Sequence, residues 1–146
     1  MINGVKISVI KTHEDNRGYF REIFRFSEEF SAYPVGQLSH SYSKENIVKF
    51  WHGHVYQYQW NHLVTGSIKV ALYDNRKESS TYGNFMEFLI SNEINPKAYF
   101  FPPGVLHGYK CLEGPMHIIY ATSGVYDIKD EVRISNEEIN YDGFNS

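Results

Sequence analysis

Apolar and polar residues alternate along much of this chain with the period of two that is typical of half-buried β-strands. Near the N-terminus Val5, Ile7 and Val9 alternate with polar residues, which predicts a first strand over residues 5–10. Short stretches of the same kind follow, separated by turn-forming residues. They predict strands at residues 19–26, 35–42, 47–51, 56–64, 68–73, 85–90, 98–101 and 117–122.

The turn signals between these strands favour an all-β barrel or sandwich over a helical bundle. They lie at residues 15–18, 43–46, 65–66, 74–83, 91–96, 102–104 and 113–115. One short helix is predicted at residues 27–33, because Ser27 can cap its start and Pro34 ends it. The tail from Asp127 onward is acidic and rich in asparagine, so we expect it to wrap the barrel or to be partly disordered.

Composition indicates one globular domain with an aromatic interior. The 146 residues match a common domain size, so we expect a single domain over residues 1–146. Aromatic residues make up 16% of the chain, which suits pleated strands and a ring-lined pocket. A formal net charge of −3 leaves no basic surface for nucleic acid, although a nucleotide diphosphate needs only a few well-placed cations or N–H groups.

Cysteine content and hydrophobic runs bear on the compartment. The single cysteine, Cys111, excludes an internal disulfide framework, and residues 1–10 lack a secretory hydrophobic run. No stretch approaches the roughly 18 consecutive apolar residues of a membrane span. We therefore expect a cytoplasmic protein with no membrane partner.

The most informative residues are histidines in two distant segments. His52 and His54 are two positions apart, so alternation within a strand directs both to one face, and Gln59 follows them. Residues 102–107 have the form Pro-x-Gly-x-x-His, in which a turn directs His107 back into the barrel. These paired segments resemble the two motifs of the cupin superfamily. The resemblance implies a cupin-type double-stranded β-helix, or jelly-roll, barrel.

The function of these histidines stays open at this point. A lone histidine on a mostly apolar strand is more often a structural group than a ligand. Together, however, His52, His54, Gln59 and His107 form a set that could coordinate iron, manganese, nickel or zinc in a metal-dependent cupin. The remaining histidines have no paired motif and are interpreted as surface or structural: His13, His40, His62 and His117.

Longer motifs make the chain resemble the dTDP-4-dehydrorhamnose 3,5-epimerase family, with similarity from about Asp15 to Tyr141. The matching segments are residues 15–22, 51–54, 72–76, 80–83, 103–109, 131–134 and 139–141, together with Tyr120 and Tyr126. The resemblance implies a cofactor-independent isomerase of a nucleotide-linked, dTDP-type 4-keto-6-deoxy sugar in surface-polysaccharide synthesis. A 3,4-ketoisomerase, which uses the same enolate, remains an alternative. By fold analogy we also expect a homodimer.

The resemblance further implies roles for individual residues. His52 would remove a proton from the carbon beside the keto group, and Tyr120 would return one to the opposite face. An enolate forms between these steps and needs hydrogen-bond donors already in place. Residues at positions that the family uses to hold the sugar, the enolate or the diphosphate are Arg17, Glu22, Gln37, Lys49, Gln59, His107 and Tyr126.

The chain also departs from the family pattern. Gln59 stands where the family has an enolate-binding lysine and carries no charge, and Lys49 replaces an arginine. The aspartate that orients the base in longer members has no counterpart, and Asp127, Asp130 and Asp142 are candidates to replace it. These departures motivate a third alternative, a nucleotide-sugar-binding homologue without catalysis.

Overall fold

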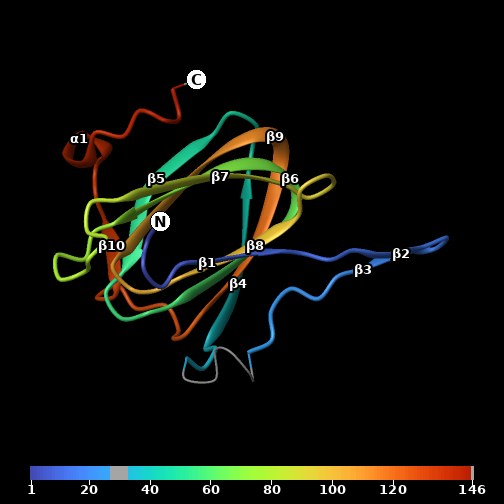
Figure 1. Cartoon of the computed structure of the whole chain (residues 1–146), viewed down its shortest axis with the longest axis horizontal. Coiled ribbons are helices and arrows are strands. Elements are labelled where there is room, and N and C mark those ends of the chain that lie inside the picture. The colour runs from blue at the N-terminus through green and yellow to red at the C-terminus, as the bar shows by residue number, and fades with distance from the viewer. Residues whose placement is uncertain (27–32, 146) are drawn as a thin grey trace.

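The structure is a computed structural model, which describes residues 1–26 and 33–145. Within these residues almost every regular element is a strand (Figure 1). The elements are β1 (Lys6–Val9), β2 (His13–Asp15), β3 (Gly18–Phe20), β4 (Gln37–Ser43), β5 (Val48–His54), β6 (Gln59–Asp74), β7 (Phe85–Ser91), β8 (Lys97–Phe101), β9 (Val105–Thr122), β10 (Glu131–Arg133) and α1 (Asn136–Ile139). The predicted all-β class is confirmed, whereas residues 27–32 of the predicted helix lie outside the described residues.

Two long strands, β6 and β9, run through both layers of the barrel. The first part of β6 pairs with β8 and with the C-terminal part of β9, and β1 and β4 extend this layer. The second part of β6 pairs with β7 and with the N-terminal part of β9, and β5 and β10 extend that layer. Apolar side chains from both layers form the main core: Leu63, Ile68, Val70, Leu72, Ile90, Tyr99, Phe101, Val105, Cys111, Met116 and Ile118.

The turns predicted at residues 65–66 and 113–115 are wrong, because β6 and β9 continue through them. The pairing register shifts between Leu63 and Ser67, where β6 bends from one layer to the other. Gly66 allows this bend because its φ is +87° and a Cβ there would lie 2.6 Å from the carbonyl oxygen of Glu113. Glycine therefore marks a bulge inside a strand and not the end of one.

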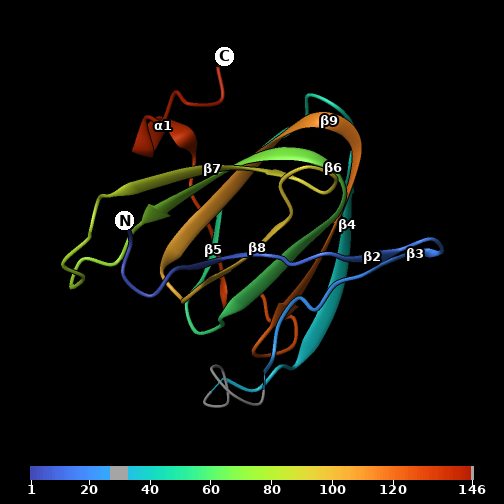
Figure 2. The same cartoon turned by 45° about the vertical axis from the view of Figure 1, so that its right-hand side comes forward.

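The N-terminal hairpin projects from the barrel. β2 and β3 form a two-stranded sheet of their own and extend away from the other strands in both views (Figures 1 and 2). The strand predicted over residues 19–26 is therefore much shorter and lies outside the main sheet. This position separates the hairpin side chains from the interior of their own barrel.

The C-terminal segment wraps the barrel, which is one of the two arrangements that the sequence predicts for it. β10 pairs with β5, and Ser135 caps the short helix α1 by accepting a hydrogen bond from the backbone N–H of Glu137. Phe144 is buried in a cluster with Trp51 and Leu106. None of the helices within residues 1–26 and 33–145 has the length and apolarity that crossing a bilayer would require.

Candidate active site

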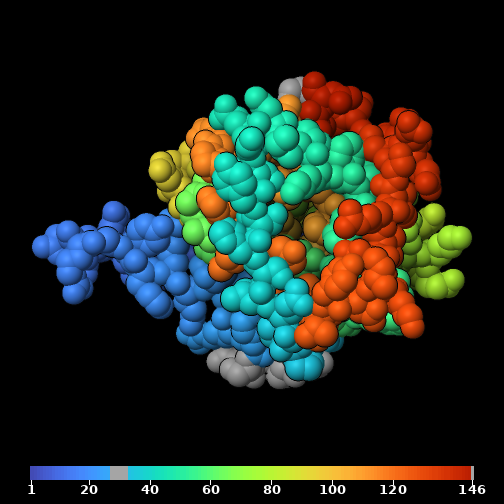
Figure 3. Space-filling view, turned by 180° about the vertical axis from the view of Figure 1, so that it is seen from behind, coloured from blue at the N-terminus to red at the C-terminus, as the bar shows by residue number. Residues whose placement is uncertain are grey.

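A cavity of about 720 Å³ opens between the two layers. Figure 3 shows the molecule hollowed between the teal residues around β4 and β5 and the orange to red residues of the C-terminal segment. Both apolar and polar side chains line the cavity, and the polar ones include three histidines: His52, His54 and His107. Cavities that combine apolar walls with a few convergent polar groups are the usual form of a small-molecule site.

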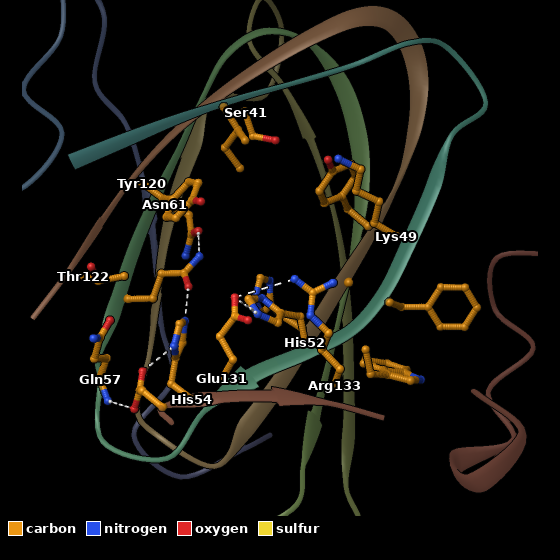
Figure 4. A pocket seen from close by; sticks show the side chains of 18 of the residues that line it. Ser41, Lys49, His52, His54, Gln57, Asn61, Tyr120, Thr122, Glu131 and Arg133 are labelled. Atoms are coloured by element: carbon orange, nitrogen blue, oxygen red, sulfur yellow. Dashed lines mark hydrogen bonds and ion pairs between the residues drawn. The ribbon is translucent and has the colours of Figure 1, made fainter. Parts of the chain in front are cut away.

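Seven of the residues predicted to act in catalysis or substrate binding line this cavity: Gln37, Lys49, His52, Gln59, His107, Tyr120 and Tyr126. Strand pairing explains the central contact, because His52 on β5 is the register partner of His107 on β9 and their ring centroids are 5.4 Å apart. Tyr120 enters from the other part of β9, where it pairs with β4 and β6. Figure 4 shows His52, Lys49 and Tyr120 directed into the same space.

Two predicted substrate-binding residues, Arg17 and Glu22, do not line the cavity. Arg17 is at the tip of the projecting hairpin, its side chain is 85% exposed, and its Nη2 lies 2.6 Å from Asp15 Oδ2. Glu22 accepts a hydrogen bond of 2.7 Å from Nε of Arg25. Neither side chain is brought together with His52 within this chain, and their contact with substrate stays a prediction.

His52 is held in a form suited to accepting a proton. Its Nε2 is buried without a hydrogen-bond partner in the described residues, and lies 3.5 Å from Glu131 Oε1, a contact that lacks hydrogen-bond geometry. Burial lowers the pKa of His52 below its ordinary value, and the neighbouring His54 lowers this pKa further, while Glu131 opposes both effects. The neutral imidazole is thus favoured, and a carboxylate stands ready to stabilise its protonated form.

His107 is buried more deeply. Its ring lies against Phe101, with centroids 4.7 Å apart, and its Nε2 has no hydrogen-bond partner among the described residues. Burial lowers the pKa of His107 well below its ordinary value, and the other two cavity histidines add to this effect. A buried nitrogen without a partner costs free energy, so a polar atom of a ligand is its natural partner.

His54 belongs to a chain of hydrogen bonds along the cavity wall. Its Nδ1 lies 2.7 Å from Asp130 Oδ2, and its Nε2 lies 2.9 Å from Gln59 Oε1. Gln59 in turn donates to Asn61. Because both ring nitrogens of His54 face side-chain oxygens, neither is free to bind a metal ion, and the four-residue metal set does not form. The described residues contain no group of three or more His, Cys, Asp or Glu side chains arranged for a metal ion.

Several cavity residues were not assigned a role from the sequence. Glu131 and Arg133 lie on the same face of β10, where Arg133 Nη2 is 3.6 Å from Glu131 Oε1 (Figure 4). The sequence shows the motif at residues 131–134, but it does not show that this segment pairs with β5. That pairing joins residues about 80 positions apart. Asn61 and Thr122 also line the cavity. Each lies two positions from a predicted site residue, Gln59 or Tyr120, so alternation along a strand could have predicted that they face the cavity.

Comparison with known proteins identifies the family of this chain. The profile of the family described as dTDP-4-dehydrorhamnose 3,5-epimerase matches residues 1–142. The spore coat polysaccharide biosynthesis protein SpsL of Bacillus subtilis is 39% identical over 137 residues, which cover 92% of this chain and 89% of that protein. The probable low-salt glycan biosynthesis epimerase Agl13 of Haloferax volcanii is 30% identical, over 97% of this chain and 89% of that protein.

Solved structures show the same fold. ChmJ, a 3′-monoepimerase from Streptomyces bikiniensis crystallised with dTDP-quinovose, superposes with a TM-score of 0.86 at 21% identity, over 96% of this chain and 75% of that one. The expected cupin-type jelly-roll is therefore confirmed. Since the family profile spans nearly the whole chain and the curated relatives align over almost all of it, this chain belongs to the dTDP-4-dehydrorhamnose 3,5-epimerase family of isomerase-class enzymes.

Proposed function

We propose that this chain is a cofactor-independent epimerase or isomerase of a nucleotide-linked 4-keto-6-deoxy sugar, with His52 as the base and Tyr120 as the acid. The observation that carries the proposal is the buried Nε2 of His52, which lacks a hydrogen-bond partner among the described residues and shares a cavity with the Tyr120 phenol. The dTDP-quinovose complex of ChmJ supports a sugar nucleotide as the ligand class. The names of SpsL and Agl13 support a role in polysaccharide or glycan synthesis.

The proposed reaction begins with proton removal. The lone pair of His52 takes the proton from the carbon beside the 4-keto group, and the C–H electrons move to form an enolate with its charge on the keto oxygen. Tyr120 then gives its phenolic proton to the opposite face of that carbon, and the enolate electrons form the new C–H bond. The imidazolium and the phenolate return to their starting forms by proton exchange with water.

The surrounding residues assist each charged state. Glu131 stabilises the imidazolium that forms when His52 takes the proton, since its carboxylate already lies 3.5 Å from Nε2. As the neutral tautomer with its hydrogen on Nε2, His107 donates a hydrogen bond to the keto oxygen, where negative charge develops. Lys49 lines the cavity and supplies a positive charge for the enolate or the diphosphate. Gln37 accepts a hydrogen bond of 2.8 Å from the backbone N–H of Tyr126, which positions that aromatic residue at the cavity.

A homodimer is part of the proposal. Arg17 and Glu22 do not line the cavity of their own chain, so their predicted contact with substrate requires a second chain. The hairpin that carries Arg17 projects from the barrel and is free to reach a partner (Figure 1). Mixed dimers of R17A and H52A chains test this: one intact site per mixed dimer should restore activity that neither variant has alone. A monomeric mass in light scattering, or no restored activity, would count against it.

The reaction itself is tested in heavy water. The protein is incubated with a dTDP-4-keto-6-deoxyhexose, and NMR follows deuterium entry at C3 and C5. We expect deuterium at one or both carbons with the native protein, a loss of at least about 100-fold with His52→Gln, and slowed or misdirected reprotonation with Tyr120→Phe. His117→Gln, on the outer face beside His40, is the matched control and should behave as the native protein does.

The outcome separates the alternatives. Deuterium at C4 with transfer of the keto group from C4 to C3 would identify a 3,4-ketoisomerase, which uses the same base. Binding of dTDP-sugars without any deuterium exchange would instead refute catalysis and favour the sugar-nucleotide-binding homologue.

A further inference from the structure

A continuous line of hydrogen bonds runs from Asp130 to the backbone of β8 along the wall of the cavity. His54 Nδ1 lies 2.7 Å from Asp130 Oδ2, and His54 Nε2 lies 2.9 Å from Gln59 Oε1. Gln59 Nε2 donates to Asn61 Oδ1 at 2.7 Å, and Asn61 Nδ2 donates to the carbonyl oxygen of Tyr99 at 3.3 Å. All five residues are buried. The direction of each bond therefore constrains the next.

The Tyr99 end of the line fixes the proton on His54 Nε2. A backbone carbonyl only accepts hydrogen bonds, so the amide of Asn61 must turn its Nδ2 toward Tyr99 and its Oδ1 toward Gln59. Gln59 must then present its Nε2 to Asn61 and its Oε1 to His54. An amide oxygen only accepts, so His54 Nε2 must carry a hydrogen.

The Asp130 end fixes the proton on Nδ1. Oδ1 of Asp130 accepts hydrogen bonds from the backbone N–H groups of Tyr56 and Gln57, at 2.6 and 3.2 Å. Two such bonds favour the ionised carboxylate, and carboxylic acids are in general stronger acids than imidazolium by more than two pK units. An ionised carboxylate only accepts, so Nδ1 of His54 must also carry a hydrogen.

We propose that His54 is a doubly protonated imidazolium in the resting protein, fixed between Asp130 and Gln59, and that it acts as a positioning residue through its charge. The ring centroid of His54 lies 5.4 Å from that of His52. A fixed positive charge at this distance disfavours a second positive charge, so His52 stays neutral and able to accept a proton. The same charge acts on His107, and it would stabilise negative charge on a ligand in the cavity.

The role in the reaction rests on the proposed function, but the protonation state of His54 does not. The other groups around His54 do not remove the need for two ring protons, since Asp130 and Gln59 are the hydrogen-bond partners of its nitrogens among the described residues. The titratable or charged groups facing it are Asp130, Glu131 and Arg133 from the C-terminal segment, His52 from its own strand and His107 from β9, while β6 contributes the uncharged Gln59 and Asn61.

The first test is NMR of the histidine ring nitrogens in ¹⁵N-labelled protein without ligand. At neutral pH we expect protons on both ring nitrogens of His54, because Asp130 and Gln59 both accept hydrogen bonds from them. In Asp130→Asn the new amide can still accept from Tyr56 and Gln57 through its oxygen and can donate to Nδ1 through its nitrogen. His54 should then lose its Nδ1 proton. Asp127→Asn, a matched carboxylate-to-amide change, should leave both protons in place.

The second test follows His52. In Asp130→Asn the fixed charge is lost, so the NMR titration of His52 and the acid limb of the rate profile should both move to higher pH. A His54 ring in the native protein with one unprotonated nitrogen at neutral pH would overturn the proposal. An unchanged His52 titration in a variant that has lost the Nδ1 proton would also overturn it. A protein that lacks turnover but keeps both His54 protons would refute the proposed function and leave this inference standing.

Discussion

The C-terminal segment holds part of the site in place, and Phe144→Ala tests how strongly. Phe144 is 5% exposed and packs against Phe50 and Tyr141, with ring centroids 5.4 and 5.0 Å apart. Burial of about 150 Å² of apolar surface at about 25 cal/mol per Å² gives about 4 kcal/mol. Because a segment near the end of the chain can partly relax into the space left, we expect about 3 kcal/mol, toward the lower end of the usual range for this change.

The loss of stability should spread from the C-terminal segment to His52, the proposed base. Asn136 accepts a hydrogen bond of 2.9 Å from Nε1 of Trp51, and β10 carries Glu131 toward His52. Urea unfolding should give a lower midpoint, and thermal unfolding should lower the melting temperature by about 10 °C. Hydrogen exchange at β10 amides should accelerate more than exchange at β6 amides, because the tail loosens locally before the barrel opens.

Ile94→Ala is the control for this experiment. Ile94 is 88% exposed, so its truncation removes similar apolar bulk without a packed environment and should cost less than about 0.5 kcal/mol. If Phe144→Ala were as stable as Ile94→Ala, and β10 exchanged at its native rate, the tail would not be held by this aromatic cluster and the reasoning would be refuted.

Three further predictions concern pH and backbone conformation. Burial lowers the pKa of His52, so kcat/KM should stay level from pH 7 to about 6.5 and fall only at lower pH; an acid limb centred above about 6.5 would contradict this. The pKa of His107 is lowered on folding, so the unfolded chain binds the proton more readily; stability should be complete above about pH 6.5 and decline below it, and His107→Gln should flatten that decline in urea titrations. Gly66→Ala should cost more than about 2 kcal/mol in thermal unfolding, since its Cβ would meet the Glu113 carbonyl at 2.6 Å, while Gly83→Ala, at a φ of +84° with open space around it, should cost only about 1 kcal/mol.

Local pattern was enough to predict most strands of the barrel and to bring His52 near His107, but it missed β2, the N-terminal part of β9 and β10. Alternation predicted that His52 and His54 lie on the same face of their strand, and the Pro-x-Gly-x-x-His segment predicted that His107 turns back into the barrel. In the structure His107 is the register partner of His52 on the neighbouring strand. Both inferences needed only the geometry of a strand and a turn. The same local logic failed at Gly66 and Pro115, because turn-forming residues also permit a strand to bend between layers.

The rest of the site depends on contacts between distant segments. Asp130 meets His54 because β10 pairs with β5, and no local pattern specifies which strand a short C-terminal segment will join. Asp130 was a candidate to orient the base, yet it contacts His54, and it is Glu131 that faces His52. Arg17 illustrates a different limit: the motif predicts a contact with substrate, but it does not say that the hairpin which carries Arg17 projects from its own barrel (Figure 1).

Gln59 has a neutral amide where the family resemblance implies a lysine, and this difference bears on how the pocket would stabilise the enolate of the proposed reaction. Gln59 accepts a hydrogen bond from His54, so it acts as the acceptor that a second imidazole proton requires. A lysine at this position has no acceptor and would repel an imidazolium. Positions 54 and 59 are therefore coupled under our proposal, because a positive charge can be present at one of them but not at both. In Gln59→Lys the lysine at position 59 should accordingly carry the positive charge, and His54 should lose its Nε2 proton and become neutral. NMR of the histidine ring nitrogens detects this loss. If Gln59→Lys left His54 doubly protonated, the cavity would tolerate both charges and this account of the substitution would fail.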